Sequence, residues 1–253
     1  MEVIFLGTGT SQGIPIIGSK HPVCLSDNPK DKRLRVSVLV KWEEYNILID
    51  CGPDFRMQML ANPVESLDAI LYTHEHNDHT AGLDDIRPFF FRQGDIPVFA
   101  HKRVLDSLRK RFEYIFTSTN KYPGAPGVQE NEIVNEAFYF KDLKITPINY
   151  MHNRLQVFGF RLKDFAYLTD LKSIEEEEVQ KLDGVKVLVV TALRIEPHHS
   201  HLNLEEALEF IARVKPERAY LTHISHLLGF HDEVQQQLPE NVFVAYDNLK
   251  ITI

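Results

Sequence analysis

Short apolar runs recur along the chain, and polar turns separate them. Runs of about four to eight residues, alternating with polar residues or continuously apolar, are typical of β-strands that are half or fully buried. The chain is therefore predicted to open as a sheet, with a hairpin whose turn is the polar segment 43–46. Predicted strands lie within residues 2–9, 35–42, 47–50, 67–74, 96–100, 143–150, 155–162, 165–170, 185–192, 218–223, 242–247 and 249–253.

Three further segments carry apolar residues at helical spacing, namely 80–93, 101–116 and 203–214. We predict a break or bend of the first near Pro88, because a proline inside a helix removes a hydrogen bond and clashes with the preceding turn. Asn203 is a predicted N-cap of the last. The middle segment has a basic face and precedes a long loop-like stretch, so we predict a helical and loop insertion at about 101–136.

Strands and helices alternate in both halves, and most strand pairs are expected to be antiparallel, which predicts a layered α/β sandwich. The chain has 253 residues, of which 43% are hydrophobic and 25% charged, and it contains no linker-like tract. We therefore predict a single domain over residues 1–253. The net charge of −8 argues against a general coat for nucleic acid.

The first residues and the cysteines favour a cytoplasmic protein. The start of the chain lacks the basic region of a signal peptide, and no segment approaches the roughly 18 apolar residues of a membrane helix. Cys24 and Cys51 are too few for a disulfide framework, which agrees with a reducing compartment. We expect no membrane partner.

The candidate chemistry begins with THEHNDH, residues 73–79. His74 and His76 are two residues apart, so in an extended segment both side chains point the same way and can ligate one metal ion. Asp78 and His79 follow where the chain turns into a helix, which redirects them toward a second ion. The alternative is a solvated histidine-rich loop. Two ions need more ligands, so we expect further His and Asp residues at other strand ends.

Three such residues follow predicted strands: His152, Asp170 and His223. Each has the same position relative to its strand as His74, so we expect all of them to converge. The order of THEHNDH, His152, Asp170 and His223 along the chain resembles that of the ligands in the metallo-β-lactamase superfamily, and the resemblance covers nearly the whole chain. The resemblance implies a four-layer αβ/βα sandwich with two divalent ions, for which zinc, manganese and iron all suit the ligands. It implies this division of the ligands: His74, His76 and His152 for one ion, Asp78, His79 and His223 for the other, and Asp170 for both.

Asp50 follows the predicted strand 47–50 and matches a carboxylate that supports the ligand histidines in the superfamily. A turn aspartate that caps the next segment is the alternative. The segments 6–15, 196–207 and 221–226 resemble the phosphodiesterase branch that contains tRNase Z and the PhnP-like proteins, and the PhnP-like proteins are the more similar. The glycines of 6–15 fit a tight turn near the metals better than a phosphate-binding loop, since neither the dinucleotide spacing nor a Walker lysine is present.

PhnP-like proteins carry a Cys-x-Cys-x-x-Cys cluster for a structural zinc, and the corresponding residues here are Ser19, His21 and Cys24, with His226 as the fourth position. Because two thiolates are lost, we favour the absence of a stable zinc site there. A degenerate three-ligand site of His21, Cys24 and His226 is the alternative.

By resemblance, His201 faces the scissile phosphate, and His201 and Asp78 are the candidate catalytic residues. We predict a hydrolase in which two metal ions activate water against a small or cyclic phosphodiester. Thioester or lactone hydrolysis at the same site and tRNA 3′ processing are alternatives, and a non-catalytic metal-binding protein is the least favoured. Nucleic acid is not the favoured partner, and a homodimer is consistent with the resemblance.

Overall fold

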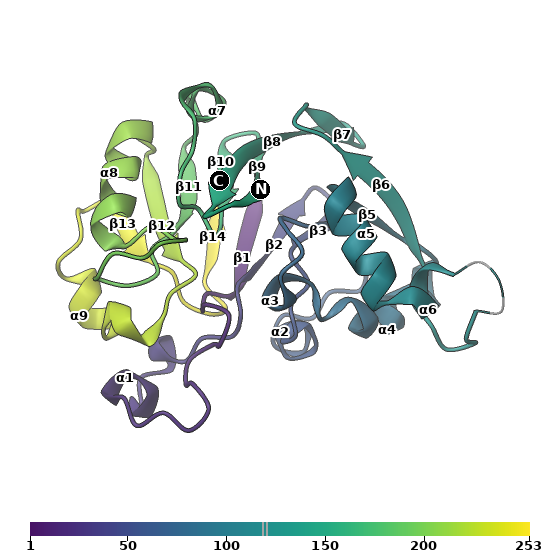
Figure 1. Cartoon of the computed structure of the whole chain (residues 1–253), viewed down its shortest axis with the longest axis horizontal. Helices are drawn as coiled ribbons and strands as arrows, with labels where there is room; N and C mark the ends of the chain where they lie inside the picture. The colour runs from purple at the N-terminus through teal and green to yellow at the C-terminus, as the bar shows by residue number, and fades with distance from the viewer. Residues whose placement is uncertain (118, 120) are drawn as a thin grey trace.

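The computed structural model describes residues 1–117, 119 and 121–253, and in this part of the chain two seven-stranded sheets lie face to face (Figure 1). The first sheet has the order β14-β1-β2-β3-β4-β5-β6, with β1 Glu2–Gly7, β2 Ser37–Trp42, β3 Tyr45–Ile49, β4 Ala69–Leu71, β5 Ile96–His101, β6 Val128–Ile133 and β14 Lys250–Thr252. The second has the order β13-β12-β11-β10-β9-β8-β7, with β7 Phe138–Phe140, β8 Leu143–His152, β9 Leu155–Leu162, β10 Phe165–Leu168, β11 Val187–Thr191, β12 Arg218–Thr222 and β13 Val242–Val244.

Strand direction differs from the expectation of mostly antiparallel pairs. Among the described residues, six of the twelve neighbouring pairs are parallel. Helices lie between most of these consecutive strands and return the chain to its starting edge, and such a crossover gives a parallel pair. The predicted hairpin is confirmed, because β2 and β3 pair antiparallel from Val38 opposite Ile49 to Trp42 opposite Tyr45. Its turn is shorter than predicted and leaves only Glu43 and Glu44 unpaired.

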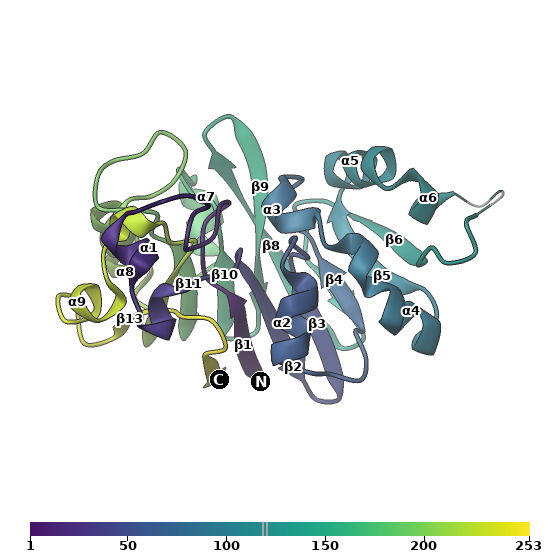
Figure 2. The same ribbon diagram turned by 90° about the horizontal axis from the view of Figure 1, so that it is seen from below.

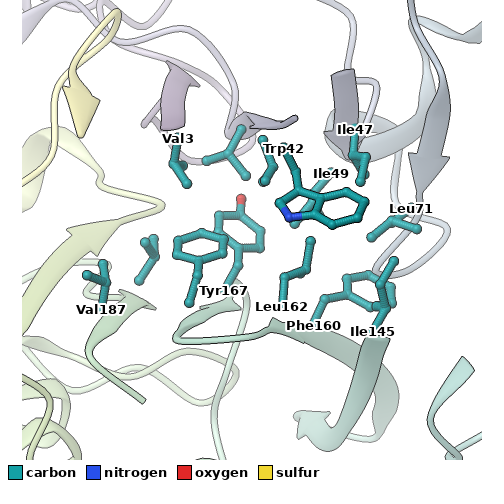
Figure 3. Packing of buried hydrophobic residues seen from close by; sticks show 14 of the residues in the cluster. Val3, Trp42, Ile47, Ile49, Leu71, Ile145, Phe160, Leu162, Tyr167 and Val187 are labelled. Carbon is teal, nitrogen blue, oxygen red and sulfur yellow. The ribbon is translucent and has the colours of Figure 1, made fainter. Parts of the chain in front are cut away.

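The largest core lies between the two sheets. Strand β1 shows how the sequence builds it, because Val3 points into this core whereas Ile4, the next residue, points outward toward the helices. Figure 3 shows side chains of both sheets meeting there, among them Trp42 of β2 and Leu162 of β9. Full burial of one large apolar side chain contributes about 1.5–3 kcal/mol, so strands that are apolar on both faces are stabilised from both sides.

Helices cover the outer face of each sheet. Over the first sheet lie α2 (Phe55–Ala61), α4 (Arg87–Gln93) and α5 (Lys102–Arg111), and over the second lie α7 (Glu176–Gln180) and α8 (Leu204–Val214). Figures 1 and 2 show α4 and α5 on one side of the molecule and α8 on the other. The predicted four-layer αβ/βα sandwich is therefore confirmed. The short helices are α1 (Pro22–Leu25), α3 (Asn77–Thr80), α6 (Glu113–Phe116), α9 (His231–Gln235) and the 3₁₀ turns η1 (Pro29–Asp31), η2 (Leu83–Ile86) and η3 (His226–Leu228).

The predicted helices agree with the structure to different degrees. Segment 80–93 is divided into the end of α3, η2 and α4. Pro88 lies in the first turn of α4, where backbone N–H groups have no acceptor within the helix, so its lack of an N–H costs no helical hydrogen bond. Asn203 caps α8 as predicted: its side chain accepts from the Glu206 N–H at 2.9 Å, and the Glu206 carboxylate accepts from the Asn203 N–H at 2.9 Å. Within 101–136, α5 and α6 connect β5 to its parallel neighbour β6. Among the described residues, every helix is too short or too polar to span a bilayer.

Candidate metal centre

Five strands bring the predicted site residues to one edge of the sandwich. Strands β8 and β10 both run antiparallel to β9, so they point the same way, and β10 is followed in parallel by β11 and β12. His152 ends β8, Asp170 follows β10 and His223 follows β12. From the first sheet come Asp50 after β3 and the segment 73–79 after β4, which continues into α3. Figure 2 shows α3 near the middle of the molecule, next to α2.

The backbone turns sharply at three of these residues. Asp50, Asp170 and His223 have φ angles of 63°, 57° and 55°, in the left-handed region that few residues other than glycine adopt. Such conformations persist only where the surrounding structure enforces them, and they concentrate at functional sites. Each turn directs a polar side chain back across the end of its strand.

Three histidines form the first group. The ring centroids of His74 and His76 are 4.5 Å apart, those of His76 and His152 are 5.3 Å apart, and those of His74 and His152 are 5.8 Å apart. His74 and His152 are buried, whereas His76 is exposed. The rings of the three residues that the resemblance assigns to one ion are therefore neighbours.

Asp78, His79 and His223 form the second group. The Asp78 Oδ2 atom lies 3.3 Å from His79 Nε2 and 3.6 Å from His223 Nε2. Their donor atoms lie within 4.8 Å of one another, a spacing that can enclose a metal ion. His79 also lies close to the first group, because its ring centroid is 4.2 Å from that of His74 and the donor atoms of His74, His79 and Asp170 lie within 4.8 Å of one another.

Asp170 lies between the two groups. Its Oδ2 atom is 3.2 Å from His79 Nε2 and 3.3 Å from His223 Nε2, while its Oδ1 atom is 4.0 Å from His152 Nε2. A carboxylate with one oxygen toward each group is the arrangement that a bridging ligand requires. Burial alone would raise the pKa of Asp170, but His223 and His79 hold it well below its ordinary value, so the group is an anion.

The outer nitrogens of the histidines are anchored by the protein. Asp50 is fully buried, and its Oδ2 atom accepts a 2.7 Å hydrogen bond from His79 Nδ1 while both carboxylate oxygens accept from Thr73. His152 donates through Nδ1 to the Ser200 carbonyl at 2.7 Å. Of the two interpretations of Asp50, this geometry corresponds to the supporting carboxylate rather than the turn cap. Anchored Nδ1 atoms leave Nε2 free to face a metal.

Those inner nitrogens make no hydrogen bond to the described part of the protein. Among the described residues, the Nε2 atoms of His74, His79 and His223 are buried without a hydrogen bond. Each buried unsatisfied polar group costs about 1–3 kcal/mol, so an arrangement that leaves several of them facing one centre is costly unless a ligand binds there. Imidazole nitrogens and carboxylate oxygens suit zinc, manganese and iron alike. The residues present therefore fit the binding of divalent metal.

The protonation states of the histidines also favour metal binding. Burial lowers the pKa of His74 well below its ordinary value, so this histidine is in the neutral form that binds metals. Burial also acts to lower the pKa of His79, but Asp78 and Asp170 raise it well above the ordinary value. A proton on His79 relieves the repulsion between the two carboxylates, and a bound cation would do so instead.

His201 lies against this centre, next to Asp170. Its Nε2 atom donates a 2.9 Å hydrogen bond to Asp170 Oδ1, and its Nδ1 atom accepts one of 3.0 Å from Ser200 Oγ. Burial lowers the pKa of His201 to about 4, although Asp170 acts to raise it. The neutral ring thus presents an N–H toward the same oxygen that faces His152.

His198 and His199 precede His201 in the same loop, and of these two only His199 is exposed. His198 is partly buried, and its Nδ1 atom lies 3.2 Å from His201 Nδ1. The sequence contains the three-residue spacing of His198 and His201 that makes this contact, but that spacing alone does not show that the loop folds back. The support of His152 by the Ser200 carbonyl is likewise invisible in the sequence, since any residue supplies a carbonyl.

The second candidate zinc site is less complete. The rings of His21 and His226 lie edge to face at 4.7 Å, and Cys24 is buried nearby in α1. His21 uses its Nδ1 atom to accept the Val23 N–H and so to cap α1. Within the described residues, the metal-ligand groups whose donors meet within 4.8 Å all belong to the centre described above, and none includes these three residues. Ser19 instead accepts the His21 N–H through its hydroxyl.

Sequence comparison agrees with this fold and centre. Residues 45–224 match the beta-lactamase superfamily domain, which is more than half of the chain. The chain belongs to the beta-lactamase superfamily. The predicted family is thereby confirmed.

The beta-lactamase superfamily relatives refine the assignment. A solved diphosphatase from the PhnP family superposes with a TM-score of 0.93 at 36% identity, over 100% of this chain and 97% of that chain, which confirms the PhnP-like branch. An octanoyltransferase of Porphyromonas gingivalis (strain ATCC BAA-308 / W83) is 40% identical over 256 residues. The alignment covers all of this chain but 52% of that protein, so the chain spans about half its length. The anti-Pycsar protein Apyc1 of Bacillus phage 010DV004 is 29% identical over 74% of this chain and 81% of its own length.

Proposed function

We propose that this chain is a binuclear metal-dependent phosphodiesterase that cleaves small or cyclic phosphodiesters. The observation that carries the proposal is Asp170, whose two oxygens face two separate groups of histidine and aspartate side chains. The orphaned Nε2 atoms around it support metal binding. The diphosphatase among the relatives supports chemistry at a phosphoryl group.

The residues of the centre have different roles, which follow from their positions. The two histidine groups and Asp170 would hold two divalent ions, which supply activation of water and neutralisation of charge on the phosphoryl oxygens. Asp50 fixes the ring of His79, and the Ser200 carbonyl fixes the ring of His152. His201 stands at the edge of the same centre, and the N–H that it gives to Asp170 would be transferred to the phosphoryl group or to the departing oxygen once the metals occupy Asp170.

A small substrate is supported by the surface as well. The basic face of α5 is the one candidate that the sequence offers for binding a long nucleic acid, but three of its five cations, Lys102, Arg103 and Arg109, are paired with carboxylates. Arg109 contacts Asp106 and Glu130, both at 2.7 Å, and Lys102 contacts Asp106 at 2.6 Å. Such pairs reduce the positive charge that the basic face of α5 offers to a phosphate backbone. This favours a small diester over transfer RNA.

Acyl chemistry is the second candidate, because one relative is an octanoyltransferase. The same metals would then polarise a thioester carbonyl instead of a phosphoryl oxygen. That relative is about twice as long as the stretch matched here, so its acyl transfer is a weaker guide than the diphosphatase, which is matched over nearly its whole length.

Hydrolysis assays separate the candidates. The protein, supplied in turn with manganese, zinc and iron, is tested on bis(p-nitrophenyl) phosphate, cyclic nucleotides and an octanoyl thioester. We expect cleavage of the phosphodiesters, with little turnover of the thioester, and about two ions per chain by elemental analysis. Cleavage of the thioester alone would replace the proposal by the acyl alternative, and a metal-free protein without any activity would refute both.

The role of His201 has its own test. His201→Ala should lower kcat on bis(p-nitrophenyl) phosphate by about 10²–10⁴-fold while the metal content stays near that of the parent, because the proton donor is lost but the ligands remain. His199→Ala is the matched control, since this neighbouring histidine is exposed. Full activity of His201→Ala would remove its assigned role, and loss of metal would make it a ligand.

A further inference from the structure

A hollow adjoins the metal centre, and only one of the residues discussed so far lines it. It has a volume of about 520 Å³, and among its lining residues are Ser11, Gln12, Ile16, Arg35, Asn77 and Asp78. Asp78 also belongs to the second metal-ligand group. A substrate that places one phosphoryl group at the metals can therefore extend directly into this hollow.

Arg35 is the one cationic side chain among the described residues that line the hollow, and its position is fixed. Its backbone N–H donates to Asp54 Oδ2 at 2.8 Å, and its carbonyl accepts from Gln58 Nε2 at 2.8 Å. The Nε atom of its side chain lies 2.9 Å from the same Asp54 oxygen. This contact is an ion pair without the geometry of a hydrogen bond, and together with the two backbone bonds it restricts Arg35, which limits the entropy that a ligand would have to remove.

Two glycines make room for Arg35 between the first loop and Asp78. A Cβ atom on Gly13 would lie 3.5 Å from Arg35 Nη1, so the guanidinium passes directly over this residue. A Cβ atom on Gly52 would lie 2.1 Å from the Asp78 carbonyl and 3.9 Å from Arg35 Cβ. Only a glycine at position 52 allows this approach, and it brings the backbone of a metal-ligand residue next to the arginine.

The outer nitrogens of Arg35 are available. In the described part of the chain, no residue accepts a hydrogen bond from Nη1 or Nη2, and 27% of the side chain is exposed. Asp54 balances the charge of the guanidinium through Nε but leaves the two-pronged end open. Such a planar pair of donors matches two oxygens of a phosphoryl group better than a lysine would. Ser11, Gln12 and Asn77 carry no charge, and the one carboxylate among the described residues that line the hollow, Asp78, is a candidate metal ligand whose charge a bound cation would offset.

We propose that Arg35 binds a second phosphoryl group of the substrate, beside the one that is attacked at the metal centre. The site would thereby prefer diphosphate-linked esters over esters with a single phosphoryl group. This inference rests on the proposed function and narrows it. In the reaction, water adds to one phosphorus and the bond from that phosphorus to the bridging oxygen breaks. One proton of the water passes to the bridging oxygen and the other stays on the attacking oxygen, which yields two monophosphate esters.

Kinetics with two substrates test the preference. ADP-ribose has a diphosphate link, whereas bis(p-nitrophenyl) phosphate has one phosphoryl group. Arg35→Gln should lower kcat/KM for ADP-ribose by about 10- to 100-fold more than for bis(p-nitrophenyl) phosphate, because a hydrogen bond to a charged group is lost with only one of them. Arg35→Lys should lie between the parent and Arg35→Gln. Arg56→Gln is the matched control, because Arg56 lines a different hollow, and it should leave both rates unchanged.

A binding measurement decides the inference without turnover. Calorimetry on the metal-loaded protein compares α,β-methylene ADP, whose link is not hydrolysed, with AMP. The parent should bind the two-phosphoryl ligand more tightly, and Arg35→Gln should lose about 10-fold or more of that difference. The melting temperature of each variant is measured to show that it is folded.

The outcomes are distinct for the two proposals. Equal losses on both substrates, or an unchanged binding difference in Arg35→Gln, would overturn the role of Arg35 while phosphodiesterase activity stands. If the parent cleaves neither phosphate substrate, the proposed function fails. Calorimetry then still reports whether Arg35 recognises a second phosphoryl group.

Discussion

Within the described residues, two clusters of charged side chains are largely buried, and they differ in how their polar atoms are satisfied. In the metal centre, several imidazole nitrogens face inward without a partner. The other cluster, which we call the arginine network, consists of Thr8, Asp31, Arg33, His231 and Asp247. Its side-chain atoms do not occur among the buried unsatisfied atoms of the described residues.

The arginine network is satisfied by its own members and the nearby backbone. Arg33 donates through Nη1 to Thr8 Oγ1 at 2.7 Å and to the Ala245 carbonyl. Asp247 accepts from Thr8 Oγ1 at 2.8 Å and from the Leu34 N–H at 2.6 Å. These bonds join the loop before β2 to the segment after β13, so the network has a structural role.

The difference teaches how to separate a binding site from a structural network when both are buried and charged. Desolvation of charged groups is costly in both places. In the arginine network, hydrogen bonds within the protein offset that cost. In the metal centre the protein orients the donors but does not satisfy them, which leaves the compensation to a ligand. Burial and charge alone do not distinguish the two clusters, whereas the count of partners does.

The largest effect should come from Asp170→Ala. Loss of the carboxylate between the two groups should lower kcat by about a thousandfold or more, equivalent to several kcal/mol of transition-state stabilisation, and should reduce the metal content. Rate and elemental analysis are measured together. Asp183→Ala, at an exposed aspartate, is the control. A variant that keeps both ions would contradict the bridging position.

Arg33→Met should act on stability instead of metal binding. It removes a buried cation together with its hydrogen bonds to Thr8 and the Ala245 carbonyl, and Asp247 loses the positive charge that acts on it, so the free energy of unfolding should fall by about 3–5 kcal/mol. Urea titration at neutral pH measures this change. The exposed pair of Arg213 and Glu176 gives the comparison, because Arg213→Met should cost at most about 1 kcal/mol. Release of metal by the folded Arg33→Met protein would contradict the prediction that the arginine network acts on stability and not on metal binding.

Asp50→Asn tests the anchoring of His79. Asparagine tolerates the left-handed backbone of this position but cannot hold the imidazole with a full negative charge. The affinity for metal should fall by about 10- to 100-fold, the usual effect of losing a partner behind a ligand histidine. Competition with a chromophoric chelator measures it. An unchanged affinity would show that the 2.7 Å contact does not matter for binding.

The smallest effect concerns pH and belongs to the arginine network. Burial, followed by Arg33, lowers the pKa of His231 to about 4, so its contribution to stability is present above pH 6.5 and is lost as the pH falls toward 4. Burial raises the pKa of Asp247 from 3.8 to about 6, so its contribution is present at low pH and is lost as the pH rises through 6. Between about pH 4 and 6 the two trends oppose each other.

Asp247→Asn removes one of these trends. Its free energy of unfolding should therefore decline by about 1 kcal/mol more than that of the parent as the pH falls from 6.5 to 4, after allowance for solvent screening. The slope is compared by urea titrations across that range, because the lost Leu34 contact lowers stability at every pH. Parallel curves for parent and variant would mean that Asp247 does not titrate there.

The sequence predicts most of the candidate centre, because strand ends and residue type are both visible in it. His152, Asp170 and His223 are recognisable as polar residues that follow apolar runs, and the structure places them together. The four-layer sandwich follows from the resemblance and is confirmed. Strand direction was predicted less well, since a buried parallel strand and a buried antiparallel strand have the same apolar pattern.

What the sequence does not predict depends on contacts between distant residues. Arg33 and Asp247 are separated by more than two hundred positions, so no local pattern joins them. Arg35 was missed for the same reason, because its importance comes from Asp54 and from the backbone of Asp78. The sequence also left two interpretations of Asp50 open, and only the position of His79 in space separates them.

The candidate ligands originate from both sheets, and this has a mechanical consequence. His74, His76, Asp78 and His79 follow a strand of the first sheet, whereas His152, Asp170 and His223 belong to the second. An ion held by both sets would cross-link the two sheets at the edge of the sandwich that carries the candidate ligands. At a free concentration one hundred times the dissociation constant, each such ion would add about 2.7 kcal/mol to the stability of the joined fold.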